Sequence, residues 1–328
     1  MLRLFTSENG LLREKRLQTP PTQETLFQLL WIDAIDPSDE ERNRIEQLLN
    51  AELPDSDDVE EIEASARFFE DAHGLHIHSL FLSQEEGRHI TTTVAFILQP
   101  QRLITFREEE IADFRLLRMR ARHGHILATN PKELLVTIFE QKVENLADTL
   151  EDLHRRLEDV SSLVLEEENS DLEEAIDLLA KIENSNGRIR LCLMDTQRAL
   201  SYLLRPQRQI DPELHETCRE MLRDIETLMT HTSFVFEKVN FLMDSAQGFI
   251  NIQQNQIIKI FSIAAVVFLP PTLVASIYGM NFEHMPELQW ELGYPFALLM
   301  MIVSGVAPYI YPESVVVESE IFPVGYWA

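Results

Sequence analysis

The stretch that decides the fold runs from Ile260 to Asn281 and reads IFSIAAVVFLPPTLVASIYGMN. Its first 18 residues carry no charge, and a second uncharged run, YPFALLMMIVSGVAPYIY, follows from Tyr294 to Tyr311. Eighteen helical residues rise about 27 Å, which is close to the hydrocarbon thickness of a bilayer. Both runs therefore predict transmembrane helices. Buried core helices are the alternative, but two such runs so close together are rare in soluble proteins.

The rest of the chain is strongly acidic. It has 28 Lys and Arg against 55 Asp and Glu, a formal charge of −27, which disfavours nucleic acid as a partner and concentrates cations near the surface. The N-terminus, MLRLFTSENGLLREKRLQTP, lacks the apolar core of a secretory signal peptide, so we expect the large N-terminal part to stay in the cytosol. Cys192 and Cys218 have no metal-type spacing and are expected to be reduced packing residues.

The first 125 residues predict a mixed α/β domain. The segments LLWIDAID, GLHIHSLFL, TTTVAFILQ and RLITFRE have the apolar character of strands, and the last two are expected to form a hairpin around Pro100 and Gln101. PSDEERNRIEQLLN has the acidic first turn and the one-sided apolar pattern of a helix. His76 and His78, two apart on a strand, resemble a metal pair, but no third ligand at suitable spacing is evident, so plain strand positions are favoured.

The basic cluster FRLLRMRAR contains Arg115, Arg118, Arg120 and Arg122. We expect a solvated face that pairs with acidic helices of the same chain. Three helices should follow: one from Asn130 and Pro131 to about Glu168, one from about Ser170 to Leu204, and one from Glu213 through the first membrane run to Tyr278. No motif for nucleotide binding, metalloprotease chemistry or a catalytic triad occurs, so nothing in the sequence predicts an enzyme.

The third helix carries a stripe of mostly small or polar residues, with Ile258 and Leu269 among them, at alternating steps of four and three. Its members are Asp244, Gly248, Asn251, Asn255, Ile258, Ser262, Ala265, Leu269, Thr272, Ser276 and Gly279. Such a repeat keeps side chains on one seam of a helix bundle. Polar groups in a membrane turn toward other helices or water, so the stripe predicts a pore lining, with close packing of small residues between helices as the alternative. Two spans cannot enclose a channel, so a pore requires a ring of copies.

The loop after this helix carries Glu283, Glu287 and Glu291 and no Lys or Arg, whereas Lys238 and Lys259 precede the first span. The positive-inside tendency then places the loop outside and the N-terminal part in the cytosol. A ring of such loops would form an acidic vestibule that attracts cations.

The segment YGMNFEHMPEL, which contains the triplet Gly279, Met280 and Asn281 between two spans, resembles the CorA family of magnesium and cobalt transporters. The segments FRLLRMRAR, RLCLMDTQRAL and KVNFLM extend the resemblance over nearly the whole chain, and it is greatest to the CorA proteins of Gram-negative bacteria. The resemblance implies an α+β membrane protein of the inner membrane that assembles as a homopentamer. It also implies that the protein carries Mg²⁺ and Co²⁺, with Ni²⁺ as a further candidate cargo, and that it uses no organic cofactor. The resemblance further implies that the triplet is the outer selectivity site and that Thr272, Leu269, Ile258 and Asn255 line the pore.

Cytosolic Mg²⁺ bound between subunits regulates this family, and Asp244 matches such a carboxylate on the stalk helix, with Asp71 as a weaker partner. The expected divisions are residues 1–125 (α/β domain), 126–258 (helical funnel), 259–280 (first span), 281–293 (external loop), 294–311 (second span) and 312–328 (tail). The tail, PESVVVESEIFPVGYWA, departs from the basic tail of the family and has no Lys or Arg. A Zn²⁺ transporter of the same superfamily and a non-conducting acidic scaffold remain the alternative functions.

Overall fold

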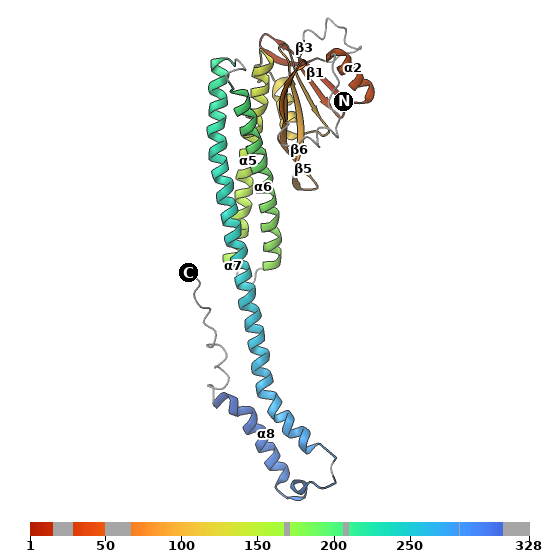
Figure 1. Ribbon diagram of the computed structural model, residues 1–328. Helices are drawn as coiled ribbons and strands as arrows, with labels where there is room; N and C mark the ends of the chain where they lie inside the picture. Colours follow the sequence, from red (N-terminus) through yellow and green to blue (C-terminus); the bar gives the residue numbers. More distant parts are fainter. Residues whose placement is uncertain (16–28, 50–66, 167–170, 206–209, 282, 311–328) are drawn as a thin grey trace. The chain divides into compact units, whose positions relative to one another are not determined.

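A computed structural model describes residues 1–15, 29–49, 67–166, 171–205, 210–281 and 283–310. The acidic tail, 312–328, lies outside these residues. The chain divides into two compact units, Met1–Ala246 and Gln247–Ala328 (Figure 1). The divisions predicted from the sequence are finer than these two units and stay a prediction.

A seven-stranded sheet forms the centre of the first unit, in the order β2-β1-β3-β7-β6-β5-β4. The strands are β1 (Leu2–Glu8), β2 (Leu11–Lys15), β3 (Leu29–Ile35), β4 (Phe68–Asp71), β5 (Gly74–Glu85), β6 (Arg88–Leu98) and β7 (Leu103–Arg107). Only β3 and β7 run parallel among the paired strands. The four strands predicted from the sequence and the β6–β7 hairpin are confirmed, whereas β1, β2 and β4 were not predicted.

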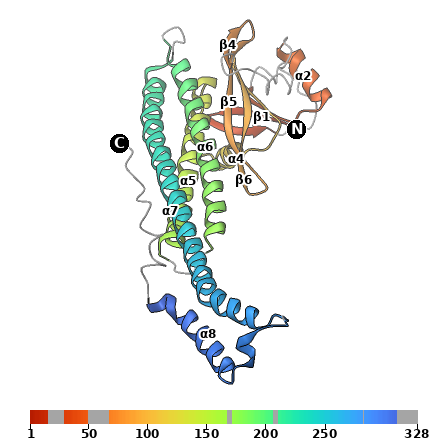
Figure 2. The ribbon, with the colours of Figure 1, turned by 60° about the horizontal axis from the view of Figure 1, so that its bottom comes forward.

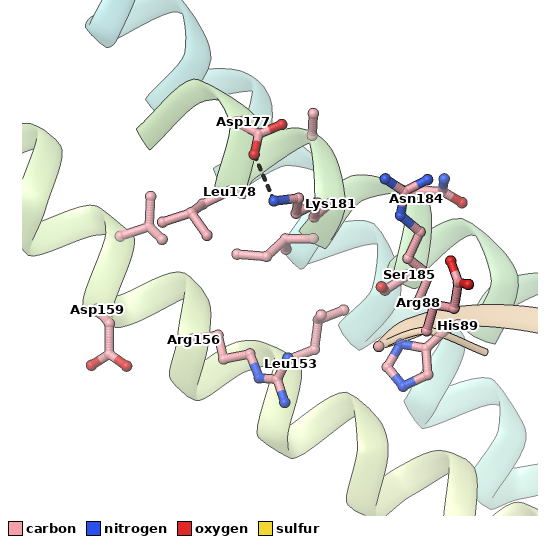
Figure 3. A pocket seen from close by; sticks show the side chains of 15 residues that line it. Arg88, His89, Leu153, Arg156, Asp159, Asp177, Leu178, Lys181, Asn184 and Ser185 are labelled. Atoms are coloured by element: carbon pink, nitrogen blue, oxygen red, sulfur yellow. Dashed lines mark ion pairs between the residues drawn. The ribbon is translucent and has the colours of Figure 1, made fainter. Parts of the chain in front are cut away.

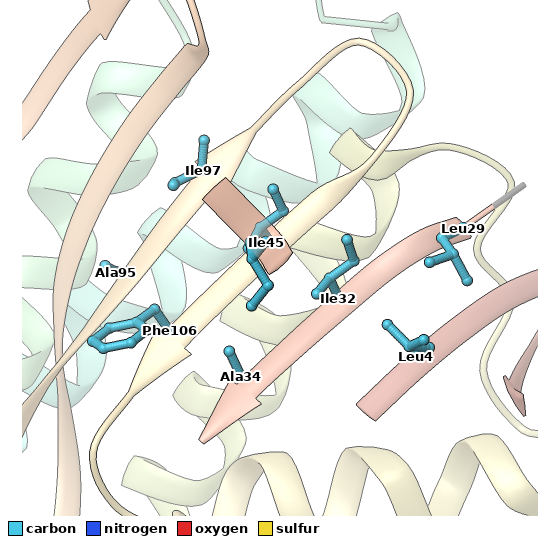
Figure 4. Packing of buried hydrophobic residues seen from close by; sticks show 9 residues of the cluster. Leu4, Leu29, Ile32, Ala34, Ile45, Ala95, Ile97 and Phe106 are labelled. Carbon is cyan, nitrogen blue, oxygen red and sulfur yellow. The ribbon is translucent and has the colours of Figure 1, made fainter. Parts of the chain in front are cut away.

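One face of the sheet is covered by α2 (Asp39–Leu49), as the sequence predicted. Ile45 of α2 is fully buried and packs with Ile32, Ile97 and Phe106 of three neighbouring strands (Figure 4). Burying an aliphatic side chain of this size contributes about 1.5–3 kcal/mol. The hydrophobic stripe of this short helix therefore suffices to hold it on the sheet.

The opposite face packs against α4 (Ala112–Arg122), α5 (Pro131–Leu165) and α6 (Leu172–Leu203), as Figures 1 and 2 show. Phe114 of α4 contacts the rings of Trp31, Phe81 and Phe96, with centroids 5.4–6.3 Å apart. Tilted aromatic pairs at such distances add to the energy of burial. The sheet therefore has a different core on each side, aliphatic under α2 and aromatic under α4.

Charged side chains are buried on this aromatic face. Asp33 of β3 accepts hydrogen bonds from both Arg107 of β7 and Arg118 of α4, and all three side chains are buried. The prediction of a solvated basic face is thus wrong for Arg118, because a carboxylate from a strand distant in sequence neutralises it inside the core. For Arg120 it is confirmed, since this guanidinium pairs with Glu144 of α5 at 3.3 Å.

The long helices begin and end close to the predicted residues. Asn130 caps α5 by accepting a hydrogen bond from the backbone N–H of Glu133 at 2.9 Å, and Pro131 occupies the first turn. Asp171 caps α6 in the same way through Glu173 and Glu174. The first two helices end at Leu165 and Leu203, a few residues before or at the expected positions.

The helix α7 (Pro212–Tyr278) is 67 residues long and contributes to both units. In the first unit it lies beside α5 and α6 (Figures 1 and 2) and buries one stripe of side chains: Cys218, Met221, Ile225, Thr232, Val235, Val239, Leu242 and Ala246. Asn186 of α6 donates to the backbone oxygen of Thr232 at 2.9 Å. Cys192 and Cys218 are buried free thiols, as predicted.

In the second unit, the end of α7 is followed by a short 3-10 helix, η2 (Pro286–Gln289), and by α8 (Gly293–Ile310). Within the described residues, α7 is the one helix that is long and apolar enough to span a membrane, and no residue of its most apolar 18-residue window is buried. The apolar stretch Gly293–Ala307 of α8 is shorter than the 18 residues needed to count as a candidate span.

Candidate functional site

The apolar half of α7 presents its stripe to the outside of the single chain. Every stripe member from Gly248 to Gly279 is exposed, including the large side chains of Ile258 (61%) and Leu269 (65%). Isolated apolar side chains at a surface are ordinary, but a whole exposed apolar helix marks a face that lipid or another protein covers. The chain by itself therefore leaves this surface incomplete.

The face of α7 that packs against α8 is a different one. Its half-buried residues are Ala264, Val267, Pro270, Pro271, Val274 and Tyr278. At about 100° per residue, the stripe members Ala265, Leu269 and Ser276 lie roughly half a turn away from Val267 and Val274. The second apolar helix thus covers the back of α7 and leaves the stripe free.

Pro271 of α7 and Gly305 of α8 lie where α8 approaches this face of α7. Pro271 has no N–H, so the carbonyl oxygen of Val267 loses its usual helical donor. A Cβ atom on Gly305 of α8 would lie 3.3 Å from the Pro271 ring and 3.5 Å from the Val267 oxygen. Because Gly305 has no side chain, the α8 backbone can approach the weakened part of α7. On the stripe side, the hydroxyl of Thr272 donates to the backbone oxygen of Phe268 at 2.7 Å.

The predicted selectivity triplet follows directly after the last turn of α7. The N–H of Gly279 still donates to Ala275 at 2.9 Å and that of Met280 to Ile277 at 3.3 Å, so the helix ends within the triplet. A Cβ atom on Gly279 would lie 3.1 Å from the Ala275 oxygen, which a larger residue would crowd. Asn281 is exposed beyond this last turn. The side-chain amide of Asn281 and the free backbone groups at the end of α7 therefore lie close together in the sequence, on exposed residues.

The turn from Glu283 to Gly293 closes on itself. Gly293 lies so close to Glu287 that an added Cβ would lie 2.3 Å from the Glu287 oxygen, and the Gly293 N–H donates to Trp290 at 2.9 Å. All three predicted vestibule carboxylates, Glu283, Glu287 and Glu291, are exposed. The turn follows shortly after α7, and its sequence contains no Lys or Arg that could neutralise these carboxylates.

The two tentative regulatory residues belong to different elements of the first unit. Asp244 is exposed on α7. Asp71 lies at the end of β4, where its carboxylate accepts hydrogen bonds from the N–H groups of His73 (2.8 Å) and Gly74 (3.1 Å). Among the residues that the structure describes, no group of three or more His, Cys, Asp or Glu in one chain is arranged to hold a metal ion. The assignment of Asp244 and Asp71 stays a prediction.

The histidines of β5 occupy buried strand positions. His76 bonds to Asp71 at 3.1 Å and stacks on Phe69, and His78 is buried. Burial lowers the pKa of His76 despite the opposing carboxylate of Asp71, and it lowers the pKa of His78 to about 4. Both imidazoles are therefore neutral core residues at pH 7, which agrees with the plain strand positions expected from the sequence.

A cavity of about 710 Å³ lies between the β5–β6 turn and the helices α5 and α6 (Figure 3). Two of its cationic side chains are neutralised: Lys181 pairs with Asp177 at 2.6 Å, and Arg156 pairs with Asp152 at 2.9 Å. The lining also includes Arg88 and Asp159. Paired charges of this kind provide no net attraction for an ion, so this cavity is not assigned a role in conduction.

Sequence reasoning missed a second buried charged group. Lys142 of α5 is fully buried, donates to Ser79 at 2.9 Å and lies 3.8 Å from Asp195, a buried carboxylate of α6. A signal was present, because Lys142 falls between Phe139 and Leu146 in the apolar stripe of its helix. This group ties β5, α5 and α6 together and supports the fold rather than the stripe on α7.

The chain combines an α/β domain, a 67-residue helix and a turn that begins with Gly279, Met280 and Asn281, and it resembles known proteins. The profile of the CorA-like Mg²⁺ transporter protein family matches residues 28–311. The chain belongs to the CorA family. It is 50% identical over 313 residues to the magnesium transport protein CorA of Escherichia coli (strain K12), which covers 95% of this chain and 98% of that protein.

Solved structures agree with this CorA fold. The complete structure of the CorA magnesium transporter from Methanocaldococcus jannaschii aligns with a TM-score of 0.72 at 21% identity, covering 96% of this chain and 98% of that one. The full-length CmaX protein aligns with a TM-score of 0.70 at 15% identity, covering 97% of each chain. At these identities the likeness concerns the fold, namely a soluble α/β domain followed by a long helix. The predicted resemblance to the CorA family is thereby confirmed.

Proposed function

We propose that this chain carries Mg²⁺ into the cell as a ring of copies, with the exposed stripe of α7 lining the pore. The observation that carries the proposal is the orientation of α7: α8 covers the face of Val267 and Val274, and the opposite face with Ser262, Leu269 and Ser276 is exposed. Family membership and the 50% identity to a magnesium transport protein supply the cargo. The number of five copies comes from the CorA resemblance.

The proposed outer site consists of Gly279, Met280 and Asn281. Mg²⁺ loses its water reluctantly, so neutral amide and carbonyl oxygens that hold the hydrated ion suit it better than a cage of carboxylates. Below this site, Asn255 and Thr272 offer polar atoms, whereas Ile258 and Leu269 form apolar constrictions that close the pore by dewetting. Co²⁺ and Ni²⁺, which also carry stable hydration shells, are the proposed secondary cargo.

The proposed orientation places the first unit in the cytosol and the turn from Glu283 to Gly293 outside the inner membrane. The carboxylates of Glu283, Glu287 and Glu291 then raise the local cation concentration at the entrance. Asp244 is the proposed regulatory ligand for internal Mg²⁺ between copies, with Asp71 as its partner. Bound Mg²⁺ would offset the repulsion between strongly acidic subunits, and its loss would loosen the ring.

Flux of Mg²⁺ into proteoliposomes, followed with an internal fluorescent indicator, tests the proposal. Wild-type protein is expected to carry Mg²⁺, and Asn281→Ala is expected to lower the flux at least tenfold. The matched control is Asn184→Ala, an amide on α6 that borders the cavity of Figure 3. Equal flux in the Asn281 variant and wild type would remove the assigned role of the triplet.

The same vesicles separate the alternative functions. Flux of Zn²⁺ without flux of Mg²⁺ would indicate a zinc transporter, and no flux of either ion at any internal Mg²⁺ concentration would indicate a scaffold. Asp244→Ala is expected to shift inhibition to higher internal Mg²⁺, because a carboxylate that binds the inhibiting ion is lost. An unchanged inhibition curve removes Asp244 from the sensor.

A further inference from the structure

A second pocket, of about 700 Å³, lies where the β4–β5 turn, the β6–β7 turn and the start of α5 meet. Its polar lining comes from all three segments: Glu70, Asp71, His73, Gln99, Gln101, Arg102 and Lys132. Small-molecule sites commonly have volumes of about 300–1,000 Å³. The pocket belongs entirely to the first unit and has no part in the stripe of α7.

Arg102 is the unusual residue of this pocket. Its side chain is only 8% exposed, and its Nε is buried without a hydrogen-bond acceptor. Among the described residues, no carboxylate forms an ion pair with it. Burial alone lowers the pKa of the guanidinium, with no opposing carboxylate. A buried cation without a partner is costly, and it is unexpected in a chain with a charge of −27.

The buried arginines of the neighbouring strand and helix provide a comparison. Arg107 and Arg118 share the carboxylate of Asp33, so their burial is compensated inside the protein. Arg102 lies just before β7, at the opposite end of this strand from Arg107, and borders a cavity whose carboxylates, Glu70 and Asp71, form no ion pair with it. The missing counterion is therefore expected to come from outside the chain.

The walls of this pocket are held in place by direct contacts between the two turns. Gln99 donates its side-chain N–H to the oxygen of His73 in the other turn at 2.9 Å, and within its own turn its backbone N–H donates to the oxygen of Arg102 at 2.9 Å. Gly74 has a φ of +141°, and a Cβ there would lie 2.6 Å from the Leu98 oxygen. Because Gly74 lets the turns touch, the guanidinium of Arg102 is presented by a preformed surface.

We propose that this pocket binds a phosphate-bearing metabolite of about nucleotide size, with its phosphate on Arg102 and Lys132. The planar guanidinium matches two phosphate oxygens, and the ammonium supplies a point charge. Lys132 stands in the first turn of the 35-residue helix α5, where the helix dipole also favours an anion. The amide of Gln101 borders the remaining volume and can bond the organic part of the ligand. This proposal does not depend on Mg²⁺ transport.

Calorimetric titration of the full chain in detergent tests the site, with AMP, ATP, inorganic phosphate, adenosine and a soluble short-chain phosphatidylglycerol as probes. AMP or ATP is expected to bind, whereas adenosine, which lacks phosphate, is not. Arg102→Gln is expected to weaken the binding of AMP or ATP at least tenfold, about 1.4 kcal/mol. The matched control is Arg156→Gln, whose guanidinium pairs with Asp152 at the other cavity.

Three results would overturn the proposal: no binding of any phosphate probe to wild type, equal affinity in Arg102→Gln, or equal affinity for adenosine and AMP. Tighter binding of the lipid than of AMP would overturn the assignment to a soluble metabolite. Without ligand, Arg102→Gln is expected to melt no lower than wild type, because it removes an uncompensated buried charge. If this variant does not fold, Lys132→Gln replaces it, and unchanged AMP affinity in that variant contradicts the proposal.

Discussion

The two halves of α7 differ in where their apolar side chains find partners. Up to Ala246 the helix buries a regular stripe against elements of the same chain, including Val239 and Leu242. Beyond Gln247 the helix is more apolar, and yet its side chains are exposed or half-buried. The first half is thus stabilised by its own chain, whereas the second half leaves most of its apolar surface uncovered in the single chain. One continuous helix therefore joins a self-sufficient unit to one that leaves an apolar face exposed.

The largest expected effect lies in the self-sufficient unit. Asp33→Ala removes the fully buried carboxylate that Arg107 and Arg118 share and leaves them only the exposed Glu110, which should lower the free energy of unfolding by about 3–5 kcal/mol. Denaturant unfolding of the purified protein measures this. Arg115→Ala, at an exposed position of the same α4, is the control and should change the value by less than about 0.5 kcal/mol. Similar losses in both variants would contradict the role of the buried network.

A matched pair of leucines on α7 tests the comparison directly. Leu242→Ala removes a buried side chain and should cost about 2–5 kcal/mol of unfolding free energy. Leu269→Ala removes an exposed one and should leave the unfolding of the first unit unchanged, while Mg²⁺ flux should rise because the proposed apolar constriction widens. Unfolding in detergent and flux in proteoliposomes give the two readings. Equal destabilisation by both changes would break the distinction between the halves of α7.

The pH dependence of stability provides a third test in the first unit. Burial raises the pKa of Asp113 from 3.8 to about 7, although Lys142 opposes the shift. The folded state then binds a proton that the unfolded state releases between about pH 4 and 7, so this group favours folding at low pH, and its contribution is lost as the pH rises toward 7. The contribution is at most about 4 kcal/mol.

Asp113→Asn removes this titration. The variant should be more stable than wild type at pH 8, and the difference should vanish near pH 4. Thermal melts of both proteins across this range check the prediction, and taking the difference cancels the opposite contribution of His78, whose pKa burial lowers to about 4. A difference that does not change with pH would show that Asp113 is not buried as the structure has it.

The smallest expected effect belongs to the turn from Glu283 to Gly293. Replacing Glu283, Glu287 and Glu291 together by Gln should lower Mg²⁺ flux about twofold to threefold at low ionic strength, because the carboxylates attract cations without binding them tightly. At an ionic strength of about 0.5 M the difference should disappear through screening. Flux measured at two salt concentrations tests this, and a loss that persists in high salt would instead indicate a direct binding role for these residues.

Individual residues show how far sequence reasoning reached. The strands β3, β5, β6 and β7 were predicted because their sequences are rich in apolar residues, whereas β2 (LLREK) and β4 (FFED) are short and rich in charge. Arg118 could not be separated from Arg115 or Arg120, since all three lie within six residues of one helix. Arg102 gave no signal, because a basic residue in a hairpin normally points to water. The stripe on α7 was visible in the sequence, but its role as a pore stays a prediction.

The sequence alone determined the two apolar runs, the length of α7, the turn YGMNFEHMPEL and the residues that share one face of the helix, because composition and helical periodicity are local properties. The tertiary structure decided which side of α7 meets α8, and it decided that Asp33, Arg102, Asp113 and Lys142 are buried. These outcomes depend on neighbours far away in the sequence. The sequence of a helix does not show whether water or a folded core surrounds a charged side chain. Only the packing of the folded chain decides whether that side chain is exposed or buried.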